Sequence, residues 1–146
     1  MQYDAPGWGV GELWLDGDRV LASSHPRPGR APQVTDCYLA ERLRAWFAGG
    51  RDDFLDVELD VDDGFHGECA RILRAVPPGQ LVTYGELAER AGRPRAARAA
   101  GTFCARNRFA VLVPCHRVVS AGGIGSFGDL GVSYKRRLLE LDGVAL

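Results

Sequence analysis

The first third of the chain alternates apolar and polar positions in short runs that are separated by turn residues. Residues 9–15 alternate in this way, and Asp16-Gly17-Asp18 supplies a turn before a second apolar run at residues 19–22. A period of two is typical of a strand that buries one face, so we expect a β-hairpin here. Residues 23–34 contain three prolines and are expected to form an irregular connection.

Two further elements are predicted before residue 62. The apolar residues between Cys37 and Phe47 have the spacing of one helix face, and Gly49-Gly50 follows them as a stop signal. Residues 55–61 alternate strictly, which predicts a half-buried strand. A small sheet with one helix is therefore the expected architecture of this part.

The second part is predicted to be mainly helical. Asp62-Asp63-Gly64 marks the expected boundary, which gives an N-terminal scaffold at residues 1–63 and a second subdomain at residues 64–146. We expect a helix from Asp63 or Gly64 to Leu73, because Pro77-Pro78-Gly79 follows.

A helix-turn-helix is predicted next. Thr83 and Glu86 have the spacing of a capping box, so a helix is expected over residues 84–91. Pro94 suits the first turn of a second helix that runs to about Cys104. Two short helices joined by a tight turn form this motif, although many such pairs bind nothing.

The second of these helices is nearly bare of bulky side chains around Arg98. Ala97, Gly101 and three further alanines surround that residue. A slim helix can approach a narrow DNA groove, and a lone arginine can enter the base stack. The small residues could equally pack against a neighbouring helix. Seven arginines and no acidic residue from Arg90 to Arg117 favour DNA.

The net charge of −1 conceals an uneven distribution of charge. Residues 1–63 carry a net charge of −7 and residues 64–146 carry +6. A polyanion would meet positive potential on the second part only. Charge alone does not decide between a nucleic-acid surface and a solvated arginine-rich surface.

The end of the chain contains three further predicted segments. Residues 110–113 predict a short buried strand that Pro114 breaks, residues 120–131 a glycine-rich loop, and residues 134–141 a helix. Leu138, Leu139 and Leu141 are expected to face inward, and Lys135, Arg136 and Arg137 outward.

Composition narrows the classes of protein that remain. Hydrophobic residues make up 46% of the 146 positions and charged residues 25%, and no apolar run approaches the ~20 residues of a membrane helix. The N-terminus has no signal-peptide pattern, so we expect a cytoplasmic protein without a membrane partner. The cysteines lack a CxxC pair, and neither a disulfide scaffold nor a metal site that includes His25 and Cys37 is expected.

Cys115 is the candidate nucleophile of the chain. A free thiol has a pKa of ~8.5 and needs a nearby base, cation or helix N-terminus to react as thiolate. His116 follows it directly, and a turn after Pro114 would let both side chains serve one site, with Asp142 as the acid that orients the imidazole. The alternative is a buried structural cysteine beside a capping histidine.

The sequence around Cys115 resembles a known signature. Val113-Pro114-Cys115-His116-Arg117-Val118-Val119 is similar to the active-site motif of the methylated-DNA–protein-cysteine methyltransferases, also called O(6)-alkylguanine-DNA alkyltransferases. The same family pattern also matches four other parts of the chain: Pro78-Gly79 to Tyr84-Gly85, Gly92 to Gly101, Asn107 and residues 135–139. The resemblance is strong from Phe65 to Gly143 and weaker over residues 3–62.

The resemblance implies a role for each matching residue. Cys115 would accept the alkyl group, His116 would deprotonate it through a water, and Asp142 would hold His116. Tyr84 would donate to N3 of the leaving guanine, and Asn107 would brace the turn. The implied DNA contacts are Thr83, Arg95, Ala97, Arg98 and Gly101, with Arg98 filling the gap left by a flipped nucleotide. The implied substrate pocket includes Pro114, Val118, Phe127 and Gly128, with the Cys115 and Val118 carbonyls recognising the guanine amine.

The implied fold is α+β: a small N-terminal sheet-plus-helix subdomain followed by a mainly helical, winged-helix-like helix-turn-helix alkyltransferase domain. The implied activity is irreversible transfer of the alkyl group from O(6)-alkylguanine in double-stranded DNA to Cys115, once per chain, after the base is flipped through the minor groove. O(4)-alkylthymine is an open second substrate. No cofactor or metal is implied, and the protein is expected to act as a monomer.

This chain departs from the family pattern in three places. Residues 127–131 are one residue longer than the usual loop, Asp142 replaces a glutamate, and residues 65–73 lack the usual glutamine and tryptophan.

Three alternatives remain open. One is a non-enzymatic alkyltransferase-like sensor that binds the lesion without transfer, although the presence of Cys115 counts against it. A helix-turn-helix regulator that reads the major groove would need more side chains on its second helix. A cysteine hydrolase would need an oxyanion hole or triad, and no such pattern is evident.

Overall fold

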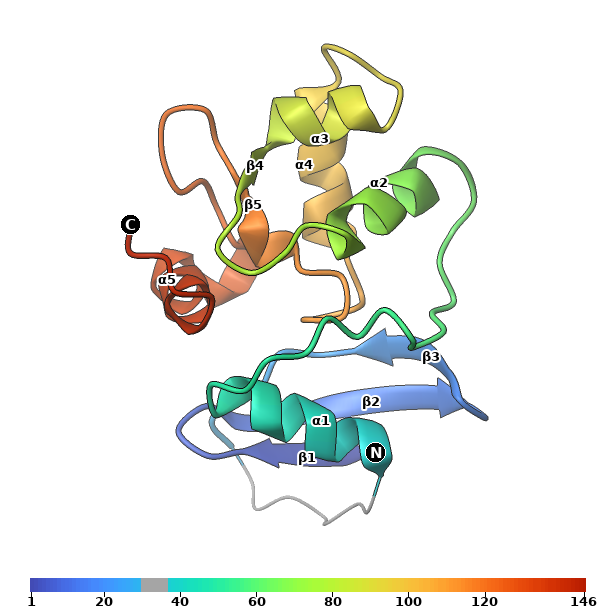
Figure 1. Cartoon of the computed structure of the whole chain (residues 1–146), viewed down its shortest axis with the longest axis vertical. Coiled ribbons are helices and arrows are strands. Elements are labelled where there is room, and N and C mark those ends of the chain that lie inside the picture. Colours follow the sequence, from blue (N-terminus) through green and yellow to red (C-terminus); the bar gives the residue numbers. More distant parts are fainter. Residues whose placement is uncertain (30–36) are drawn as a thin grey trace. The chain divides into compact units, whose positions relative to one another are not determined.

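The computed structural model describes residues 1–29 and 37–146, which form two compact units (Figure 1). One unit comprises Met1–Asp60 and Arg108–Leu112, and the other comprises Val61–Asn107 and Val113–Leu146. The chain therefore returns briefly to the first unit just before the segment that carries Cys115. We predicted a single boundary after residue 63, and no local pattern indicated this return.

The first unit is built on a three-stranded antiparallel sheet. Its strands β1 (Gln2–Ala5), β2 (Gly9–Asp16) and β3 (Arg19–Ser23) follow one another in sequence order. The hairpin of β2 and β3 confirms the prediction. We missed β1, because four residues with only Tyr3 and Ala5 buried are too short for a clear alternating pattern.

Helix α1 (Tyr38–Phe47) packs against β1, as Figure 1 shows, and confirms the predicted helix. The packing is largely aromatic. The Phe47 ring lies 6.3 Å from that of Tyr3, 5.1 Å from that of Trp8 and 5.0 Å from that of Trp46, measured between ring centroids. Such side chains bury large apolar areas, so this cluster stabilises the packing of α1 against the small sheet.

The strand predicted over residues 55–61 is absent, and that prediction was wrong. Only Leu59 pairs with a strand residue, through an isolated bridge to Val20. The preceding backbone turns instead, because the Asp52 and Asp53 carboxylates accept hydrogen bonds from the amides of Phe54 and Leu55. Aspartate that bonds the backbone two residues later favours a turn over a strand.

The second unit contains the predicted helix-turn-helix. Helices α2 (Gly64–Arg74), α3 (Tyr84–Arg90) and α4 (Ala97–Arg106) pack against one another. The capping box at the start of α3 is complete: Thr83 Oγ1 accepts from the Glu86 amide at 3.0 Å, and the Glu86 carboxylate accepts from the Thr83 amide at 3.2 Å.

Helix α4 begins later than we predicted. Pro94 and Arg95 lie in the turn before it, and Arg95 has φ 72°, which is incompatible with a right-handed helix. The helix instead starts at Ala97 and continues past Cys104 to Arg106. The turn between α3 and α4 is therefore longer than the sequence indicated.

The segment before Cys115 is buried but is not a strand. Residues 110–113 are buried as expected, yet they form turns, and Val111 has φ 69°. The predicted strand was wrong because an apolar run reports burial and not extended backbone. The following residues form a 3₁₀ turn, η1 (Cys115–Arg117), and the short strand β5 (Val118–Val119), which pairs in parallel with β4 (Val82–Thr83).

The chain ends in a short 3₁₀ turn, η2 (Gly128–Leu130), and helix α5 (Val132–Leu141). Leu138 and Leu139 are buried as predicted, but Lys135 is fully buried, which contradicts its predicted outward position. No helix in the described part of the chain is long and apolar enough to cross a bilayer.

The capping box gives a test of local stability. Thr83→Ala removes the acceptor for the Glu86 amide, so the free energy of unfolding is expected to fall by about 1 kcal/mol. Urea titration followed by circular dichroism measures the change. Thr83→Ser keeps the hydroxyl and should stay close to the wild type; an equal loss in both variants would show that the threonine methyl group matters and the cap does not.

Candidate functional site

The η1 turn brings three consecutive side chains into one buried cluster of the second unit. Cys115 is 8% exposed, His116 is fully buried and Arg117 is 6% exposed. The Arg117 amide donates to the Pro114 carbonyl at 3.0 Å, which closes the turn. A strand would have sent neighbouring side chains to opposite faces, whereas the turn buries the Cys115 and His116 side chains in the same unit.

Asp142, the C-cap of α5, holds both residues that follow Cys115. Its Oδ2 atom lies 2.9 Å from His116 Nε2 and accepts from Arg117 Nε at 2.7 Å, while Oδ1 accepts from Arg117 Nη2 at 2.9 Å. Arg117 Nη1 also donates to the Val76 carbonyl at 2.8 Å. The bidentate contact of Arg117 fixes the orientation of the carboxylate that is hydrogen-bonded to His116.

The protonation states in this cluster follow from burial and pairing. Burial acts to raise the pKa of Asp142, but its hydrogen bonds with His116 and Arg117 bring the pKa down to about 2. Burial lowers the pKa of His116 below its usual value, and Asp142 only partly offsets this. At neutral pH the site therefore holds a charged carboxylate beside a neutral imidazole.

The surroundings of Cys115 change the pKa of its thiol in opposite directions. Burial raises the pKa of Cys115, while its hydrogen bond with the Asn107 side chain and the charge of Lys135 lower it. Asn107, the C-cap of α4, also donates from Nδ2 to the Val113 carbonyl at 2.9 Å. Asn107 thus joins the end of α4 to the residues on both sides of Pro114, a position compatible with the bracing role that the family resemblance implies.

Tyr84, the first residue of α3, contacts the loop between β5 and α5. Its phenol hydrogen-bonds with Ser126, and burial raises its pKa, so the hydroxyl keeps its proton at neutral pH. Gly125 has φ 79°, and a side chain added there would place Cβ 3.1 Å from the phenol oxygen. Only glycine fits this backbone conformation and this close approach.

The candidate pocket residues come from both sides of the reactive turn. Pro114 and Val118 are buried, Phe127 is half-buried and Gly128 is exposed. The Phe127 ring stacks on Tyr134, with centroids 6.3 Å apart. The Val118 carbonyl, expected to bind the guanine amine, accepts from Lys135 Nζ at 2.6 Å and retains a second lone pair.

The candidate DNA-contact residues lie on α4, in the turn before it and at the N-cap of α3. Ala97 and Arg98 at the start of α4 are exposed, and so is Arg95 in the preceding turn, while Thr83 and Gly101 are half-buried. Ala100 is fully buried against the unit's core. The small residues of α4 therefore fit both interpretations, helix packing and DNA contact. Part of the helix packs inward, and part presents a surface without bulky side chains around Arg98.

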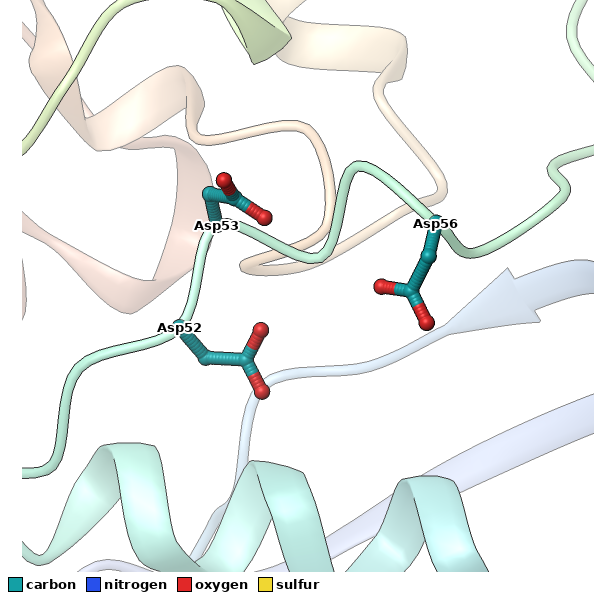
Figure 2. Close-up of side chains that lie close together, drawn as sticks. All are labelled: Asp52, Asp53 and Asp56. Carbon is teal, nitrogen blue, oxygen red and sulfur yellow. The ribbon is translucent and has the colours of Figure 1, made fainter.

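A cluster of acidic residues lies in the first unit, outside this site. Figure 2 shows Asp52, Asp53 and Asp56 on the loop after α1, close enough to share an ion. Arg42 already bonds two of these carboxylates, through four contacts of 2.7–2.9 Å to Asp52 and Asp56. The cluster is an ion pair that joins α1 to the loop, and we assign no metal to it.

The second unit matches a known family almost from end to end. The model described as "6-O-methylguanine DNA methyltransferase, DNA binding domain" matches residues 64–144. The chain belongs to this family. This match confirms the family predicted from the sequence, and the relatives and the solved structure that follow confirm the enzyme class and the α+β fold class.

Relatives extend this likeness over most of the chain. The methylated-DNA–protein-cysteine methyltransferase of Mycobacterium tuberculosis is 40% identical over 119 residues, which cover 80% of this chain and 68% of the relative. The enzyme of that name from Methanopyrus kandleri is 42% identical over 106 residues, 72% of this chain and 79% of its own. A crystal structure of Mycobacterium tuberculosis OGT in complex with DNA matches with a TM-score of 0.82 at 33% identity, covering 97% of this chain and 91% of that one.

Two features of this methyltransferase family member escaped the sequence reading. Lys135 lies at the site with no exposed surface, and Arg117 shares Asp142 with His116. The helix pattern could not place Lys135, because lysine among arginines on an amphipathic helix normally marks the solvent face. The Cys115-His116-Arg117 triplet places Arg117 next to the histidine, but no sequence pattern linked its side chain to Asp142.

The buried imidazole gives this family member a characteristic pH dependence of stability. Because the folded pKa of His116 is lowered, the unfolded chain binds the proton first as the pH falls below 6.5. Stability is therefore full above that pH and is lost below it, by up to about 1.4 kcal/mol per pH unit. The lowered pKa of Asp142 acts only in the window below 3.8.

Urea titrations from pH 7.5 to about pH 5 measure this slope. His116→Gln should flatten it, whereas His66→Gln, which removes another histidine of the same unit, should leave it in place. A slope that survives in His116→Gln would mean that another group carries the linkage.

Proposed function

We propose that this protein repairs DNA by moving the alkyl group of O(6)-alkylguanine onto the sulfur of Cys115. The observation that carries the proposal is the η1 turn, which places Cys115 beside a histidine held by a buried carboxylate. Membership of the 6-O-methylguanine DNA methyltransferase family supplies the reaction class.

His116 is the base of the proposed reaction. Asp142 is ionised and bonds Nε2, so Nε2 carries the ring proton and Nδ1 is the basic nitrogen. The imidazole, neutral at physiological pH, takes the thiol proton of Cys115 through a water molecule. The charged imidazole that results is stabilised by Asp142 at 2.9 Å.

The sulfur then attacks the alkyl carbon. A carbon–sulfur bond forms as the bond between that carbon and the guanine oxygen breaks, and the electron pair of the broken bond stays with guanine. Tyr84 donates a hydrogen bond to N3 and stabilises this negative charge, which the thiol proton finally neutralises. The raised pKa of Tyr84 keeps the phenol available as a donor.

The reaction stops after one transfer, because a thioether is a poor leaving group. The nucleophile, the base and the donor all come from one chain, so the proposal requires no metal, cofactor or second subunit. Pro114, Val118, Phe127 and Gly128 form the proposed pocket around the alkylated base, with Asn107 bracing the turn.

The proposed substrate is a base that has left the duplex. A reactive carbon inside the stack is out of reach of a buried sulfur, and flipping the nucleotide costs a few kcal/mol. Helix α4 enters the minor groove with Ala97 and Gly101 at its surface, and Arg98 fills the gap in the stack. Thr83 and Arg95 contact the backbone beside it.

Mass spectrometry tests the transfer directly. The intact protein, incubated with an oligonucleotide that contains O(6)-methylguanine, should gain the mass of one methyl group and no more, and Cys115→Ala should gain none. DNA binding without a mass gain would instead identify a lesion sensor. A parallel oligonucleotide with O(4)-methylthymine shows whether that base is a second substrate.

Arg98→Ala tests the proposed finger. Without it, transfer from a fully paired duplex should slow by about tenfold or more, since the unstacking that Arg98 offsets costs a few kcal/mol. Transfer from the free alkylated base should be unchanged, and transfer from DNA with an abasic site opposite the lesion should be nearly so. A residue that only binds phosphate would slow both DNA substrates equally, and that result would exclude the finger role.

A further inference from the structure

Lys135 is a buried cation that the proposed reaction does not yet use. It lies in α5 with no exposed surface, and among residues 1–29 and 37–146 no carboxylate forms an ion pair with it. An ammonium group removed from water costs several kcal/mol unless its surroundings compensate the charge. A lysine kept at such a place therefore needs a compensating partner.

The groups that Lys135 contacts in the structure are uncharged. Its Nζ atom donates to the Val118 carbonyl at 2.6 Å and to the Ser126 carbonyl at 3.2 Å. It also lies 5.9 Å from the ring centroid of Tyr84 and 6.0 Å from that of Phe127. Carbonyl dipoles and aromatic faces attract a cation, but none of them carries a full negative charge.

These contacts join the reactive turn to the substrate loop. Val118 follows the turn directly, whereas Ser126 precedes Phe127 and also bonds the Tyr84 phenol. One ammonium group thus holds the residue after the turn and the residue that positions the phenol. Loss of this ammonium group would loosen both the turn that carries Cys115 and the loop residue that positions the Tyr84 phenol.

The charge balance of the buried cluster indicates the missing partner. Arg117 and Lys135 each contribute one positive charge and Asp142 one negative charge, so the cluster is positive while Cys115 is a thiol. Ionisation of Cys115 with proton transfer to His116 leaves this total unchanged, but it places a negative charge on the sulfur, whereas the Asp142 carboxylate already bonds His116 and Arg117. Burial is the main influence on both groups, raising the pKa of Cys115 and lowering that of Lys135, and each group partly reverses the effect on the other.

We propose that Lys135 is the counter-ion of the Cys115 thiolate and the residue that positions the substrate loop through Val118 and Ser126. The inference rests on the proposed function, in which Cys115 is the acceptor. Lys135 keeps its proton throughout and touches no reacting atom, so it acts through the sulfur and the loop. The other titratable or charged groups that face this cluster are Tyr84 from α3, Cys104 from α4, His116 and Arg117 from η1, and Asp142 from the end of α5.

Substitutions at position 135 separate the two roles. Lys135→Gln keeps two N–H donors for the two carbonyls but removes the charge. Lys135→Met removes both at a similar length, and Lys135→Arg keeps both the charge and the donors. Arg136→Gln is the matched control, because Arg136 is an exposed cation on the same helix.

Alkylation of Cys115 by iodoacetamide, followed across pH by peptide mass spectrometry without DNA, tests the counter-ion role. Lys135→Gln and Lys135→Met should move the midpoint about one pH unit upward, which is about a tenfold loss of rate near neutral pH. Lys135→Arg and Arg136→Gln should keep the wild-type profile. A Lys135→Gln profile that coincides with the wild type would overturn the counter-ion role.

A reciprocal titration needs no change at position 135. If the thiolate stabilises the ammonium, NMR of the Lys135 side chain should show it losing its proton at a lower pH in Cys115→Ala than in the wild type. Identical titrations would overturn the proposal even if the substitutions at 135 failed to fold.

Hydrogen exchange of the loop over residues 120–127 tests the positioning role. Lys135→Met should exchange faster there, while Lys135→Gln should stay near the wild type. Unchanged exchange in Lys135→Met would refute positioning. A wild type that accepts no methyl group on Cys115 would refute the proposed function itself, and the alkylation profile would still report on Lys135.

Discussion

The turn that carries Cys115 depends on the hydrogen bonds that the Asp142 carboxylate accepts. This carboxylate lies at the end of α5 and bonds two consecutive side chains, His116 and Arg117, from a segment more than twenty positions earlier in the sequence. Because both carboxylate oxygens are engaged, the position of the imidazole is coupled to that of the guanidinium. A 3₁₀ turn of three residues has little stability of its own, so its geometry is imposed by this long-range contact and by the Asn107 brace.

The same arrangement bears on how the buried Cys115 would act as the proposed nucleophile. Burial alone makes a thiol inert, because the charged thiolate loses its water. Here the cost is opposed by a hydrogen bond from Asn107 and by the charge of Lys135, and the proposed base, His116, is neutral until it receives the proton. Because the cluster is buried, each of these interactions is stronger than it would be at the surface.

The sequence predicted the elements whose signals are local. The hairpin, α1, α2 and the capping box of α3 were all identified from short patterns, because capping and periodicity are encoded within a few residues of one another. Tyr84 and Arg98 were placed on the correct helices. The sequence also named Cys115, His116, Asn107 and Asp142, whose roles stay predictions.

The predictions that were wrong concern features that depend on contacts between distant parts of the sequence. Residues 55–61 alternate like a strand but lack a neighbour along most of their length, and residues 110–113 are apolar but turn. Whether an apolar run extends depends on partners far away in the chain, which a pattern cannot supply. The outward position predicted for Lys135 was wrong for the same reason, since its contacts with the carbonyls of Val118 and Ser126 come from segments outside its own helix.

Gly125 has a consequence for anyone who wishes to redesign the range of groups this chain accepts. Its backbone approaches the Tyr84 phenol so closely that every other amino acid would displace one or the other. Gly128, three positions later, has open space around it but a φ of 53°, which also favours glycine, whereas Asp129 is an exposed side chain without that constraint. A combinatorial library aimed at bulkier adducts should therefore vary exposed non-glycine positions of this loop such as Asp129 and keep Gly125 invariant.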